Sequence, residues 1–248
     1  MAIATLSNSC YASRVEARDI DRLVRALCEG DEGHHLTERM SHGEAADVIA
    51  DLYVAHQDAV RRLPVVAGEL GHEIACQRGC HECCYELVLV TAAEAHVMAL
   101  ELLRPENAAL LERFEAQADD WLDASEDRAQ RACVALAAAD WPTYLEKRRE
   151  HHRARQLCPL NQDGECTLYD ARPLRCRSAW VVDSADRCGP DVEPRPQLVS
   201  YPAYEQFLAM TRRLSSGLQE AVGRPGERRQ SLPYAVCEEL ARLRAGVT

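Results

Sequence analysis

The chain has 248 residues, of which 47% are hydrophobic and 28% charged, so it can bury a sizeable core without a covalent staple. Its 40 acidic residues outnumber its 29 basic ones, and the resulting net charge of −11 argues against a protein that coats phosphate backbones. The unusual feature of the composition is its twelve cysteines.

The start of the sequence does not resemble a secretion signal, because residues 1–14 have no basic start and no long apolar run. The most apolar window, 85–103, contains Glu86, Glu94 and Glu101 and therefore cannot cross a bilayer. We therefore predict a cytoplasmic protein with neither a membrane nor a nucleic acid as its partner. Thiols are kept reduced in that compartment, where clustered cysteines are more often metal ligands or redox centres than disulfides.

Helical spacing of apolar residues dominates the first part of the chain. It predicts one helix over 14–27 and a second that begins at Ser41 and ends at Pro64. Thr91 stands three residues before a glutamate, which is the spacing of a capping box. This pattern predicts a third helix that begins after Thr91 and ends before Pro105.

The second half of the chain alternates between helix-forming and loop-forming segments. Good helix formers fill 107–155 and predict two or three helices, interrupted near 123–126 and at Trp141-Pro142. Residues 156–196 contain four cysteines and five prolines but few periodic apolar positions, so we expect a loop-rich segment. The remaining predicted elements are helices over 202–221 and 234–243 and short strands over 87–90 and 179–182.

These elements predict a mostly α fold, in which a single helical domain carries two cysteine-rich loop segments that close on a metal centre. We expect an N-terminal helical extension over 1–69, a cysteine-cluster metal-binding domain over 70–190, and C-terminal helices over 191–248 packed on that domain. Metal binding would order the segment 156–196, so part of the folding free energy would depend on the metal.

Eight of the twelve cysteines fall in two blocks. The first block is Cys76, Cys80, Cys83 and Cys84, and the second is Cys158, Cys166, Cys176 and Cys188. The second block lies among Pro, Gly, Asn and Asp, where no core helix uses thiols as filler, so these cysteines need a partner. The isolated Cys28, Cys133 and Cys237 have apolar helical neighbours and are predicted to be packed core thiols, whereas Cys10 is left unassigned.

Soft thiolate ligands select zinc, copper(I) or iron-sulfur clusters. A structural zinc ion needs four ligands and clusters commonly use four cysteines, so eight thiols complete two centres, or one centre with ligands to spare. Neighbouring side chains diverge by about 100° on a helix and about 180° on a strand. Cys83 and Cys84 therefore suit two metal ions, or two irons of one cluster, better than one ion.

Two stretches of the sequence match a known pattern. They are Cys76-Gln-Arg-Gly-Cys80-His-Glu-Cys83-Cys84 with Val88-Leu-Val-Thr91-Ala-Ala-Glu94, and Cys158-Pro-Leu with Cys166-Thr-Leu-Tyr169-Asp-Ala-Arg172-Pro173-Leu-Arg-Cys176-Arg177 and Cys188. Together they resemble the YkgJ-type cysteine-cluster family, the zinc- or iron-chelating CxxCxxCC domain. The resemblance covers about residues 70–190. It departs from the family name in the first gap, which holds three residues instead of two.

A related cysteine motif occurs in flagellin lysine methylases, where it is associated with an iron-sulfur cluster. The present sequence contains no glycine-rich dinucleotide or S-adenosylmethionine loop, so the methylase activity is not carried over. The resemblance therefore implies metal chelation and no particular reaction.

A thiolate-bound centre is negatively charged and gains from nearby cations and from donors to sulfur. Three arginines around Cys176 are candidates for both roles: Arg172, Arg175 and Arg177. An alternative for Arg172 is that it caps the preceding turn and pairs with Asp170. Tyr169 either donates to sulfur or packs.

Histidines give weaker signals than the cysteines. His81 lies inside the first block, where it is an alternative ligand to a thiolate. The adjacent pairs at 34–35 and 151–152 lie in highly charged stretches, and we interpret them as solvated surface residues.

The leading functional hypothesis is an iron-sulfur protein, with a 4Fe-4S cluster as cofactor, that acts in redox chemistry, in electron transfer or as an accessory to another enzyme. The alternative is a zinc-binding module with a structural or metal-handling role. A third alternative is an enzyme whose cluster leaves one coordination position open for substrate. The expected partners are metal ions and a protein redox or client partner.

Overall fold

The computed structural model describes residues 3–5, 49, 53, 63–69, 71–77, 79–182, 184–192, 197–200, 211–212 and 229–246. Most of these residues are helical, which confirms the mostly α class. The predicted helix over 14–27, the pair at 34–35, Cys10 and Cys28 lie outside the described residues. Of the helix predicted from Ser41 to Pro64, Ile49 and Tyr53 are described as helical and buried.

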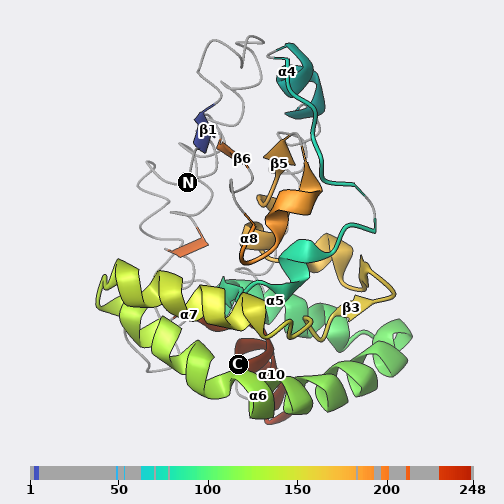
Figure 1. Ribbon diagram of the computed structural model, residues 1–248. Helices are drawn as coiled ribbons and strands as arrows, with labels where there is room; N and C mark the ends of the chain where they lie inside the picture. Colours follow the sequence, from blue (N-terminus) through green and yellow to red (C-terminus); the bar gives the residue numbers. More distant parts are fainter. Residues whose placement is uncertain are drawn as a thin grey trace, which may run out of the picture.

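Four helices form a layer at the base of the molecule in the view of Figure 1. They are α5 (Ala92–Leu102), α6 (Ala108–Ala137), α7 (Trp141–Arg153) and α10 (Leu232–Arg244). A short 3-10 turn, η2 (Pro105–Asn107), joins α5 to α6. The apolar faces of α5, α6 and α10 enclose the main core, whose largest fully buried side chains include Met98, Phe114 and Leu240, and α7 packs on a second cluster around Trp121 of α6.

Helix α6 continues without interruption through 123–126, so the predicted break there is wrong. Trp121, Ser125 and Ala129 are buried at intervals of four residues, which keeps one packed face continuous while the acidic residues between them face solvent. The helix ends only after Ala137. Trp141-Pro142 then begins α7, because proline is tolerated in the first turn of a helix.

The capping box predicted at the start of α5 is present. The Thr91 hydroxyl accepts a hydrogen bond from the Glu94 N–H at 3.3 Å, and the Glu94 carboxylate accepts one from the Thr91 N–H at 3.0 Å. Helix α10 begins at Leu232, two residues before the predicted start. It follows directly on β7 (Gln230–Ser231), which pairs antiparallel with β2 (Leu89–Val90).

The segments that carry the cysteines lie on top of the helical layer (Figure 1). They contain only short elements: α4 (Leu63–Glu69), η1 (Glu82–Tyr85), β3 (Asn161–Gln162), β4 (Glu165–Cys166), η3 (Tyr169–Ala171), α8 (Leu174–Arg177), β5 (Val181–Val182) and η4 (Ala185–Cys188). This pattern agrees with the loop-rich segment expected from the sequence. The strands predicted over 87–90 and 179–182 are present as the shorter β2 and β5.

A small sheet borders the cysteine-bearing segments. Its strand order is β1 (Ile3–Thr5), β6 (Gln197–Ser200) and β5, with β1 parallel and β5 antiparallel to β6. Within the described part of the chain, no helix is both long enough and apolar enough to span a bilayer.

Candidate metal centre

Backbone hydrogen bonds hold the two cysteine blocks together. The N–H of Cys158 donates to the carbonyl of Cys84 at 2.9 Å, which joins the end of the first block to the start of the second. The N–H of Ala75 donates to the carbonyl of Val181 at 2.9 Å, and Ile74 forms an antiparallel bridge with Val182. Residues about 100 positions apart in the sequence are thus fixed side by side.

Sulfur atoms take part in this junction as well. The Cys76 thiol donates to the carbonyl of Ala179 at 3.5 Å and accepts from the N–H of Val181 at 3.3 Å. The Asn161 amide donates to the Cys84 sulfur at 3.4 Å. In each case a cysteine of the first block is bonded to the segment that carries the second.

The β3–β4 hairpin, which ends at Cys166, rests against the first block. Its turn requires glycine, because Gly164 has a φ of +86°. A Cβ atom on Gly164 would lie 3.3 Å from the His81 Nδ1 and 3.4 Å from the Gly79 carbonyl oxygen. The close approach that Gly164 allows therefore seats the hairpin on the loop between Cys76 and Cys83.

Six of the eight thiols fall into two sets, according to which of them raise one another's pKa when charged. The first, called here the outer set, is Cys76, Cys80 and Cys188, and the second, the inner set, is Cys158, Cys166 and Cys176. Cys83 interacts with members of both sets and forms a hydrogen bond with the Cys84 thiol. We call Cys83 and Cys84 the vicinal pair.

Burial makes Cys76, Cys188 and the three inner thiols weak acids. It raises the pKa of Cys76 to about 11 and that of Cys188 to about 12, and it raises the pKa of the inner thiols as well. Negative charge on one thiol of a set raises the pKa of its neighbours further. Clustered thiols of this kind hold their protons at neutral pH until a metal ion displaces them.

Arg172 is the cation that faces the inner set. Burial raises the pKa of Cys166 and Cys176, and the positive charge of Arg172 opposes this rise. Its guanidinium lies 3.7 Å from the centre of the Tyr169 ring. The Nε of Arg172 is buried and has no hydrogen-bond partner among the described residues. Arg172 thus presents an unused donor next to several thiols.

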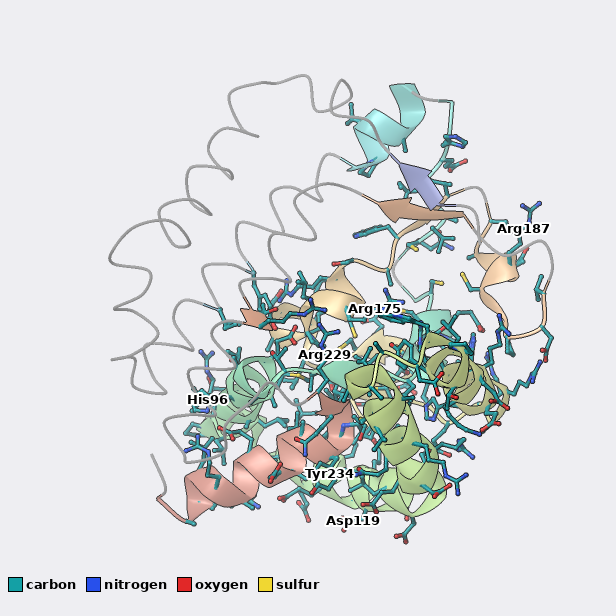
Figure 2. All side chains as sticks on the ribbon, turned by 90° about the vertical axis from the view of Figure 1, so that its left-hand side faces the viewer. His96, Asp119, Arg175, Arg187, Arg229 and Tyr234 are labelled. Atoms are coloured by element: carbon teal, nitrogen blue, oxygen red, sulfur yellow. The ribbon has the colours of Figure 1, made fainter. Side chains whose placement is uncertain are left out.

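The other predicted cofactor-binding residues have different surroundings. Tyr169 is 49% exposed and packs under Arg172. The ion pair between Arg172 and Asp170 that we considered is not among the ion pairs of the described residues. Arg177 is buried and donates to the carbonyl oxygens of Asp170 and Arg172, so it holds the loop that carries Arg172. Arg175 is exposed and lies between the helical layer and the η4 residue Arg187 in Figure 2.

Helix α7 fixes the first block from below through ion pairs. Arg155, just beyond its end, donates to both Glu82 carboxylate oxygens at 2.7 and 2.9 Å, and this hydrogen bonding is the main cause of the lowered pKa of Glu82. The Arg148 guanidinium reaches the Glu86 carboxylate at 2.5 Å. The Arg155 guanidinium also lies 3.6 Å from the centre of the Tyr85 ring.

The interpretation of His151 and His152 as solvated surface residues is wrong, because both are buried. They lie on the face of α7 that packs on α6 and on η1. The His151 ring is 5.2 Å from that of Trp121, and His152 lies 3.6 Å from the Glu86 carboxylate. Of the charged residues around this pair, Glu146 and Arg149 are exposed, whereas Arg148 lies on the same side as His152 and pairs with Glu86. His81, the alternative ligand, has its Nδ1 3.1 Å from the Gly79 carbonyl oxygen.

Sequence reasoning missed two residues of the site. Asn161, which contacts Cys84, follows Cys158 by three residues in a turn-forming stretch, and that stretch gives no signal for a contact with sulfur. Tyr53 lies outside both blocks, yet its ring stacks under Arg177 at 4.1 Å. By contrast, Cys133 and Cys237 pack against the hydrophobic core, as predicted.

As they stand, no three or more Cys, His, Asp or Glu side chains in the described part of the chain are grouped to hold one metal ion. Comparison with protein-family models, with curated proteins and with solved structures finds no match for this chain. The resemblance to the YkgJ-type family therefore stays a prediction from the sequence.

Proposed function

We propose that the chain is an iron-sulfur protein with a redox, electron-transfer or enzyme-accessory role, in which the eight clustered cysteines hold two centres. The single observation that supports this most strongly is that hydrogen bonds hold the two cysteine blocks together, from the Cys158 N–H to the Cys84 carbonyl at 2.9 Å and from the Val181 N–H to the Cys76 sulfur at 3.3 Å. Each set has three cysteines, and one member of the vicinal pair completes each to the four thiolates that clusters commonly use.

The surroundings of the inner set favour a cluster over a zinc ion. The buried Nε of Arg172 lacks an acceptor, although three thiols lie within range of its charge. A buried donor without a partner costs about 1–3 kcal/mol. A cluster would offer inorganic sulfide as an acceptor in addition to its thiolates, whereas a zinc ion with four thiolates would offer the thiolates alone.

A bound cluster would accept and release one electron at a time, and the protein would control that exchange. The charge of Arg172 would offset negative charge on the inner centre, and the core of the helical layer beneath it would exclude water. Cys83 is exposed, so the centre that it completes would lie within reach of a partner protein. Because Cys83 and Cys84 are consecutive residues, the two centres would be neighbours.

The test is metal and sulfide analysis of the full chain purified anaerobically. Two 4Fe-4S centres correspond to about eight iron and about eight sulfide per chain, with broad absorption near ~400 nm that bleaches with a strong reductant. Colourless protein with stoichiometric zinc and no acid-labile sulfide would overturn the proposal and establish the zinc alternative.

Cysteine variants test the division into two sets. We expect Cys188→Ser and Cys176→Ser each to lose about half of the bound iron, because each removes a ligand from a different centre. Cys80→Ser should behave like Cys188→Ser. The matched control is Cys133→Ser, which alters a core thiol and should leave the iron content unchanged. Equal loss in Cys133→Ser and the three ligand variants would show that the assignment of the cysteines is wrong.

A further inference from the structure

Tyr53 is a buried residue whose hydroxyl makes no hydrogen bond within the described structure. The residue is 4% exposed, and its hydroxyl is buried without a hydrogen-bond partner. Buried tyrosine hydroxyls normally find a partner, because the hydroxyl loses its hydrogen bonds to water on burial. The position of this hydroxyl therefore calls for an explanation.

The ring of Tyr53 is fixed next to the inner set. It lies 4.1 Å from the Arg177 guanidinium, and Arg177 directly follows Cys176 on the short helix α8. The start of α8 is itself anchored, because the Glu94 carboxylate accepts from the N–H of Leu174 at 2.8 Å. Helix α8 thus carries Cys176 and, through the contact of Arg177 with Tyr53, also fixes the Tyr53 ring.

The nearby acceptor of the chain is already occupied. Glu94 accepts hydrogen bonds from the Thr91 N–H, the Thr91 hydroxyl and the Leu174 N–H, and Tyr53 is not among its donors. Burial raises the pKa of Tyr53, and the negative charges of Glu94 and Cys176 contribute to that rise. The phenol therefore keeps its proton and is available as a donor toward the Cys176 side.

We propose that Tyr53 is a positioning residue of the inner centre, donating its phenolic hydrogen to a sulfur atom of that centre beside Cys176. The inference rests on the proposed function only in requiring a metal centre at the inner set. A donor to sulfur stabilises the loaded state and the more negative oxidation state of a cluster. Tyr53 and Arg172, two of the buried donors that lack an acceptor among the described residues, would then serve the same centre from two elements.

The test compares Tyr53→Phe with the wild-type chain in two states, metal-free and loaded. The substitution keeps the ring under Arg177 and removes only the hydroxyl. In the metal-free protein it removes a buried group without a partner, so we expect an unchanged or higher melting temperature. In the loaded protein it removes a hydrogen bond, so we expect a lower melting temperature and about 10-fold weaker metal retention against a chelator.

Tyr234→Phe is the matched control, because Tyr234 is exposed at the start of α10. It should move neither the melting temperature nor the retention of metal. If Tyr53 served only to pack against Arg177, Tyr53→Phe would change neither state or would shift both in the same direction, and the inference would be overturned. A wild-type chain that binds no metal would instead overturn the proposed function.

For iron-loaded protein the reduction potential gives a second readout. At a fixed potential, the ratio of reduced to oxidised inner centre should fall about threefold to tenfold in Tyr53→Phe. Tenfold corresponds to about 59 mV for one electron, toward more negative potential. An unchanged potential in a variant with full iron and sulfide content would also refute the role of Tyr53.

Discussion

His151 makes a pH-dependent contribution to stability whose size follows from its surroundings. The residue is fully buried where α7 packs on α6, its ring lies 5.2 Å from that of Trp121, and neither ring nitrogen has a hydrogen-bond partner among the described residues. Burial, the positive charge of Arg128 and the neighbouring His152 together lower its pKa from 6.5 to about 4, and the negative charge of Glu86 opposes them. His151 is therefore neutral in the folded protein at neutral pH.

The sign of the effect follows from proton binding. Between pH 6.5 and about 4 the unfolded chain protonates His151 whereas the folded protein does not, so protons favour the unfolded state. The stability present above pH 6.5 is lost as the pH falls toward 4. At about 1.4 kcal/mol per pKa unit, the difference between 6.5 and about 4 corresponds to about 3 kcal/mol.

The assay is urea unfolding of the wild-type chain and His151→Phe at several pH values from 7 to 4. Phenylalanine keeps an aromatic ring against Trp121 and does not titrate. Relative to the wild-type chain, the variant should gain about 3 kcal/mol of unfolding free energy between pH 7 and pH 4. Contributions of other groups, including the thiols, cancel in this difference. Parallel curves for the two proteins over the whole range would refute the buried, neutral state of His151.

Three further substitutions test contacts that position the site. Glu94→Gln should lower the unfolding free energy by about 2 kcal/mol and loosen metal binding, measured by urea unfolding and chelator competition, because the carboxylate joins α5 to α8. Gly164→Ala should cost about 1–2 kcal/mol in the same unfolding assay, since φ is +86° and His81 Nδ1 would lie 3.3 Å from the new Cβ; an unchanged midpoint would contradict this. Glu239→Gln should destabilise by about 2 kcal/mol at pH 7, because Arg242 and His96 outweigh burial and lower the pKa of Glu239 to about 2. That difference should vanish as the pH falls from 4.5 toward 2 in acid unfolding curves.

Local signals predicted the helices well where one short motif decides the boundary. The capping box at Thr91 fixes the start of α5, and Pro142 lies in the first turn of α7. The false break at 123–126 shows the limit of such reasoning. Polar residues there suggested an interruption, but a helix of 30 residues keeps its path because Trp121, Ser125 and Ala129 pack on one face.

The candidate site was likewise predicted from the sequence only in part. Cysteine spacing marked all eight candidate ligands, because thiols in loop-forming segments are conspicuous in a sequence. It did not indicate Tyr53, which reaches the site from a distant helix through a tertiary contact with Arg177. Nor did it show that His151 and His152 are buried, since their charged neighbours hide the helical face on which they lie. Contacts between distant elements leave no pattern in a local window.

Acidic residues lie beside the vicinal pair, and arginines of α7 and its end neutralise them. Cys83 and Cys84 are flanked by Glu82 and Glu86, and carboxylates beside a negatively charged centre would repel it. Each carboxylate is instead paired with an arginine from α7 or its end, Glu82 with Arg155 and Glu86 with Arg148. The side chains of the Glu86–Arg148 pair are only 33% and 19% exposed, so water screens their attraction weakly.

Because of these ion pairs, the proposed centre depends on the arginines that α7 and its end supply. Removing the Arg148 charge would leave Glu86 partly buried without its arginine, two residues beyond the vicinal pair. The same helix carries His152, which lies 3.6 Å from Glu86. The layer of α6 and α7 thus supports the cysteine-bearing segments and also supplies the positive charge that allows acidic residues to stand beside the thiols. A chain with a net charge of −11 can hold an anionic centre only if its arginines are concentrated in this way.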